Sequence, residues 1–303
     1  MSRTLDRGIL LIGWSGQLGY ELERHLGVLG AVTAVDQDRI DLSRPEEIRT
    51  MIRSVRPGWI VNAAAYTAVD VAESQPGLSQ AINAVAPGVI GEEAQRIGAG
   101  VVHYSTDYVF DGNASEPYLE TAIPQPVNVY GQTKLEGEQR LAASGAPFLI
   151  LRTSWLYATR GKNFLLTILR LAQERPELRI VGDQIGAPTW ARMVAAATAA
   201  MLAQLAAHAD PARFSGVYHI TAAGQTTWAG FAQAILDQYP ASEFSRGQKD
   251  PPLRTKQIQA ISTSDYPTPA KRPAYSLLNN RKLRETFGLA LPDWQEQLRL
   301  ALG

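Results

Sequence analysis

Two kinds of segment alternate along the first half of the chain. Short, almost continuous apolar runs predict β-strands, at Ile9–Ile12, Ala31–Val35, Trp59–Asn62, Val101–Tyr104 and Phe148–Leu151. Longer amphipathic stretches between them predict helices, at about Gln17–Leu26, Pro45–Val55, Leu78–Ile97 and Tyr130–Ala143. Strands that are apolar on both faces are normally covered by helices on both sides. The pattern therefore predicts an α/β fold with a doubly wound parallel sheet (Rossmann).

The pattern becomes less regular beyond Trp155, where prolines divide the chain into shorter pieces. The Ala-rich segment Trp190–Ala207 predicts a long helix, which we expect to pack against the first domain. The stretch Gln248–Tyr275 is the most irregular, and we interpret it as a flexible substrate loop. We expect a first domain over residues 1–155, joined by helix 190–207, and a smaller, irregular C-terminal substrate lobe over residues 156–189 and 208–303.

Composition excludes several classes of protein. The 303 residues carry 29 Lys and Arg against 29 Asp and Glu, so there is no positive surplus for a nucleic-acid partner. The absence of cysteine excludes disulfides, thiolate zinc sites, iron–sulfur clusters and a cysteine nucleophile. The longest apolar runs, Gly8–Gly13 and Met193–Ala207, are too short or too Ala-rich to span a bilayer. The first run is also unlike a secretory signal, because Gly13 and Gly16 interrupt it. We expect a cytoplasmic protein with no membrane partner.

Glycines at 13, 16 and 19 follow the first predicted strand and open the first predicted helix. Glycine permits a tight turn and lets backbone N–H groups approach a pyrophosphate at the helix N-terminus. The spacing is G-x-x-G-x-x-G rather than the usual G-x-G-x-x-G, so a turn without a ligand is an alternative. Asp36 ends the second strand, where an acidic residue can bind an adenosine ribose, although a surface acidic residue is also common there.

Tyr130 and Lys134 are four residues apart at the start of a predicted helix, so their side chains share a face. A nearby ammonium favours the phenolate, and we expect it to lower the pKa of Tyr130 toward neutrality. An ordinary amphipathic helix start is the alternative interpretation. Ser105–Tyr108 lies at the carboxyl end of the fourth strand, which is where doubly wound sheets bind ligands. Together these residues indicate a catalytic site.

Longer segments carry a resemblance that covers nearly the whole chain. They are GWSGQLG at 13–19, NAAAYTAVDVAES at 62–74, VVHYSTDYVFDG at 101–112, NVYGQTKLEGE at 128–138, LRTSWLYA at 151–158, DQIGAPT at 183–189, YHI at 218–220 and YPTPAKRPAYSLLN at 266–279. The sequence resembles the dTDP-4-dehydrorhamnose reductases, a family within the extended short-chain dehydrogenase/reductase superfamily.

The resemblance implies hydride transfer from reduced nicotinamide to the C4 ketone of dTDP-4-dehydro-6-deoxy-L-mannose, which gives dTDP-L-rhamnose for polysaccharide biosynthesis. It implies that Tyr130 donates a proton to the C4 oxygen, that Lys134 holds the nicotinamide ribose and depresses the tyrosine pKa, and that Thr106 orients the ketone.

The resemblance, with the glycine turn, also implies a set of binding residues. The cofactor-binding residues would be Gly13, Gly16, Gln17, Leu18, Gly19, Asp36, Asp41, Leu42, Ala65, Tyr66, Thr67, Tyr104, Tyr130 and Lys134. The substrate-binding residues would be Thr106, Asp107, Tyr108, Trp155 and Arg272. For Trp155 the alternative is a core aromatic, and for Arg272 a solvated surface arginine. We interpret Asn62 as a hydrogen-bonding residue at a strand end, outside the site.

Cofactor preference, metal and oligomeric state stay open. Asp36 favours NADH over NADPH because it repels a 2′-phosphate, yet Arg39 lies nearby in sequence and offsets this. Some relatives in the family are metal-bridged dimers. Here Arg192 stands where the expected carboxylate would be, which argues against Mg²⁺, although Glu21 remains available. We expect no metal, and either a monomer or a homodimer.

Three other functions have to be weighed. A 4,6-dehydratase of the superfamily needs a glutamate after Thr-Asp, and this chain has Tyr108 there. An epimerase, which needs a tightly held and recycled cofactor, is harder to exclude. A non-catalytic alternative is a protein like the regulatory subunit of methionine adenosyltransferase, but the presence of Thr106, Tyr130 and Lys134 favours an enzyme.

Overall fold

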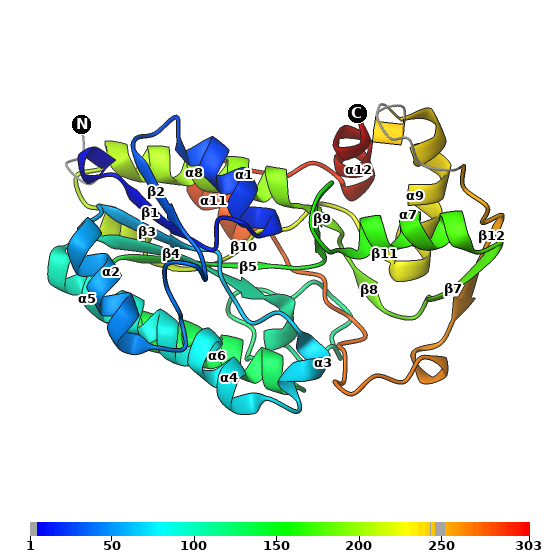
Figure 1. Cartoon of the computed structure of the whole chain (residues 1–303), viewed down its shortest axis with the longest axis horizontal. Helices are drawn as coiled ribbons and strands as arrows, with labels where there is room; N and C mark the ends of the chain where they lie inside the picture. Colours follow the sequence, from blue (N-terminus) through cyan, green and yellow to red (C-terminus); the bar gives the residue numbers. More distant parts are fainter. Residues whose placement is uncertain (1–4, 243, 246–251) are drawn as a thin grey trace.

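A six-stranded parallel sheet forms the centre of the molecule (Figure 1). The computed structural model describes residues 5–242, 244–245 and 252–303. The strand order is β10-β5-β4-β3-β1-β2, with bounds β1 Ile9–Ile12, β2 Val32–Val35, β3 Trp59–Asn62, β4 Gly100–Thr106, β5 Phe148–Thr153 and β10 Gly216–His219. The chain passes from β2, at one edge, back across β1 to β3, so the topological switch point lies between β1 and β3. The predicted α/β class and doubly wound sheet are confirmed.

The predicted strands agree closely with the observed ones. β1 and β3 have the expected bounds, and β2 begins one residue later than expected. β4 and β5 each continue two residues further at their carboxyl ends, to Thr106 and Thr153. Ser105 and Thr106 are polar but buried, at about 5% exposure each, because the neighbouring strand and the helices cover them. The extension carries Thr106 to the edge of the sheet.

Helices cover both faces of the sheet (Figure 1). α1 (Gln17–Leu26), α8 (Ala191–Ala207) and α11 (Arg281–Phe287) cover one face, and their apolar residues join Leu11 and Val102 in one core cluster. α2 (Pro45–Val55), α5 (Ala86–Ile97) and α6 (Val129–Ala142) cover the other. α8 packs against α1, as the Ala-rich pattern predicted, because small side chains allow close approach of the two helices.

The single helix expected over 78–97 has a more complex form. α4 (Pro76–Gln80) leads into a π-helical turn, η2 (Ala81–Val85), and then into α5. Pro87 has no N–H to donate to the carbonyl of Asn83, which removes one α-helical hydrogen bond within this stretch. The Asn83 side chain bonds instead across to the backbone N–H and carbonyl of Tyr66, at 2.9 and 3.0 Å. The widened turn therefore anchors the segment that follows β3.

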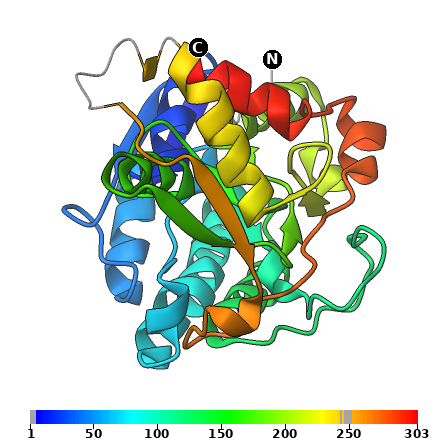
Figure 2. The same cartoon turned by 90° about the vertical axis from the view of Figure 1, so that its right-hand side faces the viewer.

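A smaller lobe stands beside the sheet (Figure 1) and faces the viewer in Figure 2. It contains α7 (Phe164–Glu174), α9 (Trp228–Gln238) and α12 (Trp294–Leu302), and three strand pairs: β7 (Glu177–Val181) with β12 (Gln257–Ile261), β8 (Ile185–Gly186) with β11 (Thr226–Thr227), and β6 (Leu156–Tyr157) with β9 (Thr189–Trp190). Tyr157, Phe231 and Trp294 lie in its separate core. Short helical pieces complete the described chain: η1 (Leu5–Arg7), α3 (Val69–Ala72), η3 (Asp107–Val109), η4 (Pro211–Phe214), η5 (Tyr239–Ala241) and η6 (Thr263–Asp265).

Two parts of the second half differ from expectation. β10 and α11 fall within residues 208–303, which we assigned to the lobe, yet β10 pairs with β5 and α11 packs on the sheet. The sequence pattern missed β10 because its residues, Gly-Val-Tyr-His, do not form a continuous apolar run. In the stretch expected to be a flexible loop, residues 248–251 lie outside the described residues, whereas 257–261 form β12, paired with β7 along its whole length. Where the structure describes the chain, it contains no helix long and apolar enough to cross a membrane.

Candidate active site

The glycine turn brings the backbone of β1 and α1 very close together. Gly13 has φ +85°, a left-handed conformation that favours glycine. A Cβ on Gly19 would lie 1.9 Å from the Gly13 carbonyl oxygen, so no other residue fits there. Gly16 is the N-cap of α1, and Gln17 and Leu18 form its first turn, which contains no acidic residue. The N–H groups of this helix end are therefore available to an anion.

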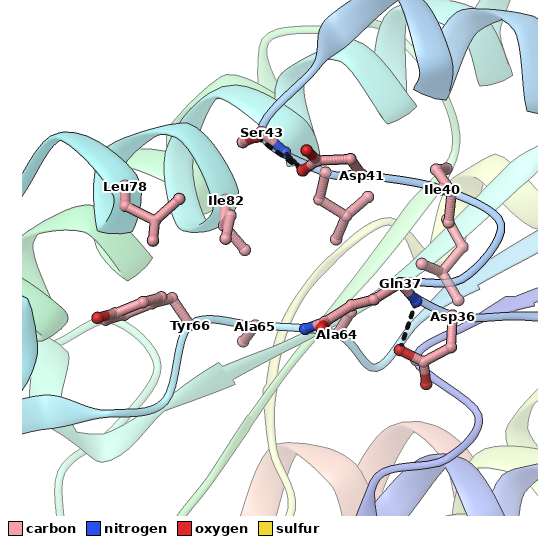
Figure 3. Close-up of a pocket in the computed structure, with 13 residues that line it drawn as sticks. Asp36, Gln37, Ile40, Asp41, Ser43, Ala64, Ala65, Tyr66, Leu78 and Ile82 are labelled. Atoms are coloured by element: carbon pink, nitrogen blue, oxygen red, sulfur yellow. Dashed lines mark hydrogen bonds between the residues drawn. The ribbon is translucent and has the colours of Figure 1, made fainter.

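A pocket of about 410 Å³, the first pocket, opens at the carboxyl ends of β1, β2 and β3 (Figure 3). Six of the predicted cofactor residues line it: Gly13, Asp36, Asp41, Leu42, Ala65 and Tyr66. Gln37, Ile40, Ser43, Leu78 and Ile82 complete much of the wall and were not predicted. Thr67 follows Tyr66 and is exposed to solvent. Since the pocket lies at the switch point of the sheet, it is where such a fold binds a nucleotide.

The two acidic residues of the first pocket already have partners. One oxygen of Asp36 accepts hydrogen bonds from the Ser15 backbone N–H and hydroxyl, at 3.0 and 2.6 Å, and the other accepts from the Gln37 N–H at 2.8 Å. Asp41 accepts from the backbone and hydroxyl of Ser43, and these bonds lower its pKa. Asp36 is thus more than a surface acidic residue, because it fixes the glycine turn as well as lining the pocket.

Thr106, Tyr130 and Lys134 come together where β4 ends and α6 begins. The Asn128 side chain caps α6 by accepting from the Gly131 N–H at 2.8 Å, which sets the start of the helix and the direction of Tyr130. The Thr106 side chain interacts with the Tyr130 phenol and acts to lower the phenol pKa. Burial has the larger effect and raises the pKa of Tyr130 to about 12. The expected depression of this pKa is wrong for the ligand-free protein.

Lys134 explains that difference, because its Nζ is turned to other partners. Its Nζ donates to the Tyr104 carbonyl oxygen and lies 3.3 Å from Nε2 of His103. The side chain is 1% exposed, and burial lowers the pKa of Lys134 to about 8. Tyr104 contributes only its backbone here, since its phenol hydrogen-bonds the Thr198 hydroxyl at 2.7 Å within the core.

Asp107 is a buried carboxyl next to Thr106. It is 2% exposed, and its Oδ1 accepts from the Thr106 hydroxyl at 3.0 Å. Burial raises the pKa of Asp107 to about 7, against the opposing effect of its hydrogen bonds. The group therefore changes charge near neutral pH, in direct contact with a predicted catalytic residue.

A larger cavity of about 670 Å³, the second pocket, lies between η3 and the smaller lobe. Of the predicted substrate residues, Tyr108 and Arg272 line it, together with Trp228 and Gln184. The Tyr108 ring meets the Tyr130 ring edge-to-face at 5.4 Å, so the second pocket borders the catalytic group. Thr106 and Asp107 are buried behind this wall.

Arg272 is not a solvated surface arginine, as one alternative supposed. Its side chain is 24% exposed and pairs with Asp70, whose oxygens accept from Nη1 and Nη2 at 3.0 and 2.7 Å. The ion pair joins α3 to the segment before residue 273, which closes one side of the second pocket. Burial lowers the pKa of Arg272, but Asp70 and other neighbours raise it overall.

Trp155 is half-buried and stacks on Trp228, with ring centroids 3.5 Å apart. Its φ of +47° is left-handed, and its indole occupies the space that a Cβ on Gly186 would need. Trp155 thus supports the second pocket through Trp228, a residue for which the sequence offered no signal. Asp70 does lie within the segment 62–74, but nothing in the pattern paired it with Arg272.

The position considered for a metal is occupied by a cation of the protein. Arg192 Nε donates to Glu21 Oε2 at 3.1 Å, and Glu21 is 3% exposed. Across the part of the chain that the structure describes, no cluster of three or more His, Asp or Glu side chains could hold a metal ion.

Comparison with known proteins gives one consistent result. The RmlD substrate binding domain family matches residues 7–303. A dTDP-4-dehydrorhamnose reductase from Burkholderia thailandensis is 50% identical over 295 residues, which cover 97% of each chain. The enzyme of the same name from Escherichia coli K12 is 46% identical and covers 95% of this chain and 94% of its own.

A solved structure agrees with these relatives. The dTDP-4-dehydrorhamnose reductase of Bacillus anthracis, in complex with NADP, superposes with a TM-score of 0.85 at 32% identity, over 97% of both chains. The agreement extends through both the sheet and the smaller lobe.

Proposed function

This chain belongs to the RmlD substrate binding domain family, and from that membership we propose that it reduces the C4 ketone of dTDP-4-dehydro-6-deoxy-L-mannose to dTDP-L-rhamnose. It is an NAD(P)H-dependent oxidoreductase. Its place in the cytoplasm, and its state as a monomer or homodimer, stay predictions.

The observation that carries the assignment of roles is the position of Tyr130 beside both Thr106 and the second pocket. The phenol interacts with Thr106, and its ring contacts Tyr108, which lines the pocket. A group that must donate a proton has to hold it at working pH, and a pKa of about 12 ensures this. Tyr130 is therefore the proposed proton donor to the C4 oxygen.

Thr106 and Lys134 support this donor in different ways. Thr106 would hydrogen-bond the same substrate oxygen and so orient the ketone toward the phenol. Lys134 would stabilise the phenolate left after proton transfer, because an ammonium nearby favours the ionised form. When bound, the reduced nicotinamide supplies the hydride.

The two pockets divide the binding between cofactor and sugar nucleotide. We assign the first pocket and the N-terminus of α1 to the dinucleotide, because backbone N–H groups and the helix dipole favour a pyrophosphate. We assign the second pocket to the nucleotide sugar, with Arg272 at its wall and Trp155 behind it. NADPH and NADH both remain candidates, since Asp36 is engaged by Ser15 and Arg39 lies close in sequence.

A turnover assay tests the proposal. The purified protein is incubated with dTDP-4-dehydro-6-deoxy-L-mannose and, separately, NADPH or NADH, while the absorbance of reduced nicotinamide and the sugar product are followed. We expect stoichiometric cofactor oxidation and formation of dTDP-L-rhamnose. A sugar that changes without cofactor oxidation would indicate an epimerase, and no change in either would contradict an enzymatic role. The UDP and GDP analogues of the sugar measure nucleotide selectivity.

A further inference from the structure

Three buried polar side chains form a chain of contacts that ends on Lys134. Asn62 is the last residue of β3, and His103 lies opposite it on β4. The Asn62 amide nitrogen is 3.2 Å from Nδ1 of His103, and Nε2 of the same ring is 3.3 Å from Nζ of Lys134. Each of the three residues is 1% exposed. Which atom donates and which accepts in each contact is therefore determined by neighbouring protein groups rather than by solvent.

The backbone of Ala64 fixes the orientation of the Asn62 amide, at one end of this series of contacts. Its N–H donates to Asn62 Oδ1 at 3.2 Å. A backbone N–H cannot reverse its polarity, and turning the Asn62 amide over would leave that N–H facing an NH₂ group. With the amide oxygen held by Ala64, the NH₂ group is the one directed at His103. Nδ1 of His103 must then accept, and a neutral ring carries its single hydrogen on Nε2.

The imidazole of His103 is neutral. Burial lowers the pKa of His103 well below its ordinary value, and the charge of Lys134 lowers it further. Its Nε2–H then points at Nζ of Lys134. An ammonium group has three donors and no acceptor, whereas an amine has a lone pair that can receive this hydrogen bond while it donates to the Tyr104 carbonyl.

We propose that Asn62 fixes the tautomer of His103 and that the two residues thereby favour the unprotonated amine of Lys134 over its ammonium form in the ligand-free protein. Both are positioning residues, since they act through Lys134. In this arrangement every hydrogen bond of the chain is satisfied. Protonation of Lys134 requires the ring to move its hydrogen to Nδ1, and Asn62 then has to turn over and leave the Ala64 N–H without its acceptor.

One charged group near Lys134 opposes the amine, and it is already paired. Glu138, on the same helix, favours the ammonium, but both of its oxygens accept from Arg152 of β5, at 2.9 and 2.6 Å. Tyr104 of β4 holds its phenol neutral, because burial raises the pKa of that group. Tyr130 of α6 is neutral, and Asp107 of η3 affects Tyr130 more directly than Lys134. Burial, which lowers the pKa of Lys134, acts in the same direction as the hydrogen-bond chain.

The consequence is a coupling between charge and ligand. An anionic dinucleotide binds an ammonium better than an amine, so by linkage its binding should bring a proton to Lys134. The lysine would gain its positive charge when the cofactor arrives. The proposal itself concerns the free protein, so it stands or fails independently of the proposed reduction.

Nuclear magnetic resonance of the free, folded protein tests the tautomer directly. Long-range ¹H–¹⁵N spectra distinguish the two neutral forms of histidine, and the signals of His103 are assigned by their loss in His103→Gln. Above about pH 8, where Lys134 is an amine, we expect the Nε2–H form. An Nδ1–H form at that pH would overturn the proposal, as would an imidazolium.

A substitution that reverses the polarity at Asn62 tests the coupling. In Asn62→Asp the carboxylate accepts from Ala64 and from Nδ1–H together, so Nε2 becomes an acceptor for the ammonium. We expect the pKa of Lys134, followed by its ¹³Cε shift in lysine-labelled protein, to rise by about one unit or more. Lys134→Arg assigns the signal.

The control separates the tautomer from simple charge. Both measurements are repeated in a His103→Phe background, where the carboxylate can act on Lys134 only through space. The rise caused by Asn62→Asp should fall to less than half there. An equal rise in both backgrounds would contradict the role of His103, and the tautomer spectrum of the parent protein decides the question if the His103→Phe variant does not fold.

Discussion

Neighbouring side chains in the candidate site hold their protons in unlike ways. Tyr130 is buried and keeps its proton, while Asp107, one residue beyond Thr106, changes charge near pH 7. Burial disfavours the charged form of both groups and so raises both pKa values. The pKa of Asp107 still lies far below that of Tyr130, because an ordinary carboxyl starts from a far lower pKa than an ordinary phenol. Two proton-holding groups thus meet at the single hydroxyl of Thr106.

Replacement of the Tyr130 hydroxyl tests its role as donor. We expect Tyr130→Phe to lower kcat by about 100-fold or more, because general acid catalysis contributes that much, while the Kd for the dinucleotide changes little. Steady-state kinetics and calorimetry measure the two quantities. Tyr239→Phe, which removes a phenol hydroxyl from the smaller lobe, is the matched control and should leave kcat unchanged. If Tyr130→Phe turned over substrate as fast as the parent protein, Tyr130 would not be the proton donor.

The charge of Asp107 should make stability depend on pH. Its folded pKa of about 7 lies above the ordinary value of 3.8, so the folded protein binds this proton more tightly than the unfolded chain does. The favourable contribution is complete at about pH 4 and is lost as the pH rises through 7, with a span of at most about 4 kcal/mol.

Asp107→Asn isolates this contribution, because the amide oxygen can still accept from Thr106. Denaturant unfolding at several pH values measures the free energy of unfolding. Between pH 5 and pH 8 we expect that of the variant to rise relative to that of the parent protein. A constant difference across that range would show that Asp107 does not titrate there.

Among the secondary-structure elements, β1, the glycine turn and α1 can pack as they do only because residue 19 has no side chain. The Gly13 carbonyl lies where a Cβ of residue 19 would be. We expect Gly19→Ala to weaken dinucleotide binding by more than 10-fold, because the turn must open, and to lower the free energy of unfolding by a few kcal/mol. Gly77→Ala is the control, since a Cβ there has no atom within 4 Å. Calorimetric Kd values compare the two, and equal effects would contradict the steric argument.

The sequence indicated the elements that carry their own signal and missed those that depend on partners. β1 and β3 are uniformly apolar, and α1 and α2 have clear amphipathic patterns, so their bounds follow from the pattern. β10 contains Gly and His within its four residues, so it lacks a uniformly apolar pattern, and its pairing with β5 is what identifies it as a strand. The π-helical turn depends on Pro87 and on the bond between Asn83 and Tyr66, which joins residues far apart in the chain.

The same distinction holds within the site. Motif spacing indicated Tyr130, Lys134 and the glycine turn, and resemblance added part of the first pocket. Nothing in the pattern pointed to His103, which looks like any strand residue until Lys134 is placed beside it. The pKa of Tyr130 was also misjudged, because spacing on a helix says nothing about the other partners that Lys134 meets.

For the molecule as a whole, the ion pair between Arg192 and Glu21 connects α8 to α1 where a bridging metal was considered. A cation already adjacent to Glu21 opposes the binding of a second one. We expect a chelator to change neither turnover nor the mass measured by light scattering. Arg192→Ala, which frees Glu21, tests the reason: if turnover or mass then responds to Mg²⁺, the guanidinium is what excludes the ion. A chelator-dependent mass in the parent protein would contradict the prediction.

The position of β10 has a consequence for how the chain is made. During synthesis β5 emerges well before β10, and until β10 follows, one row of its backbone N–H and C=O groups has no partner. An open strand edge invites pairing with other chains. Residues of the distant half complete the nucleotide-binding sheet, so the first half of the chain does not contain every strand of its own sheet. A gene divided after residue 155 would release a first half whose sheet ends in an unprotected edge.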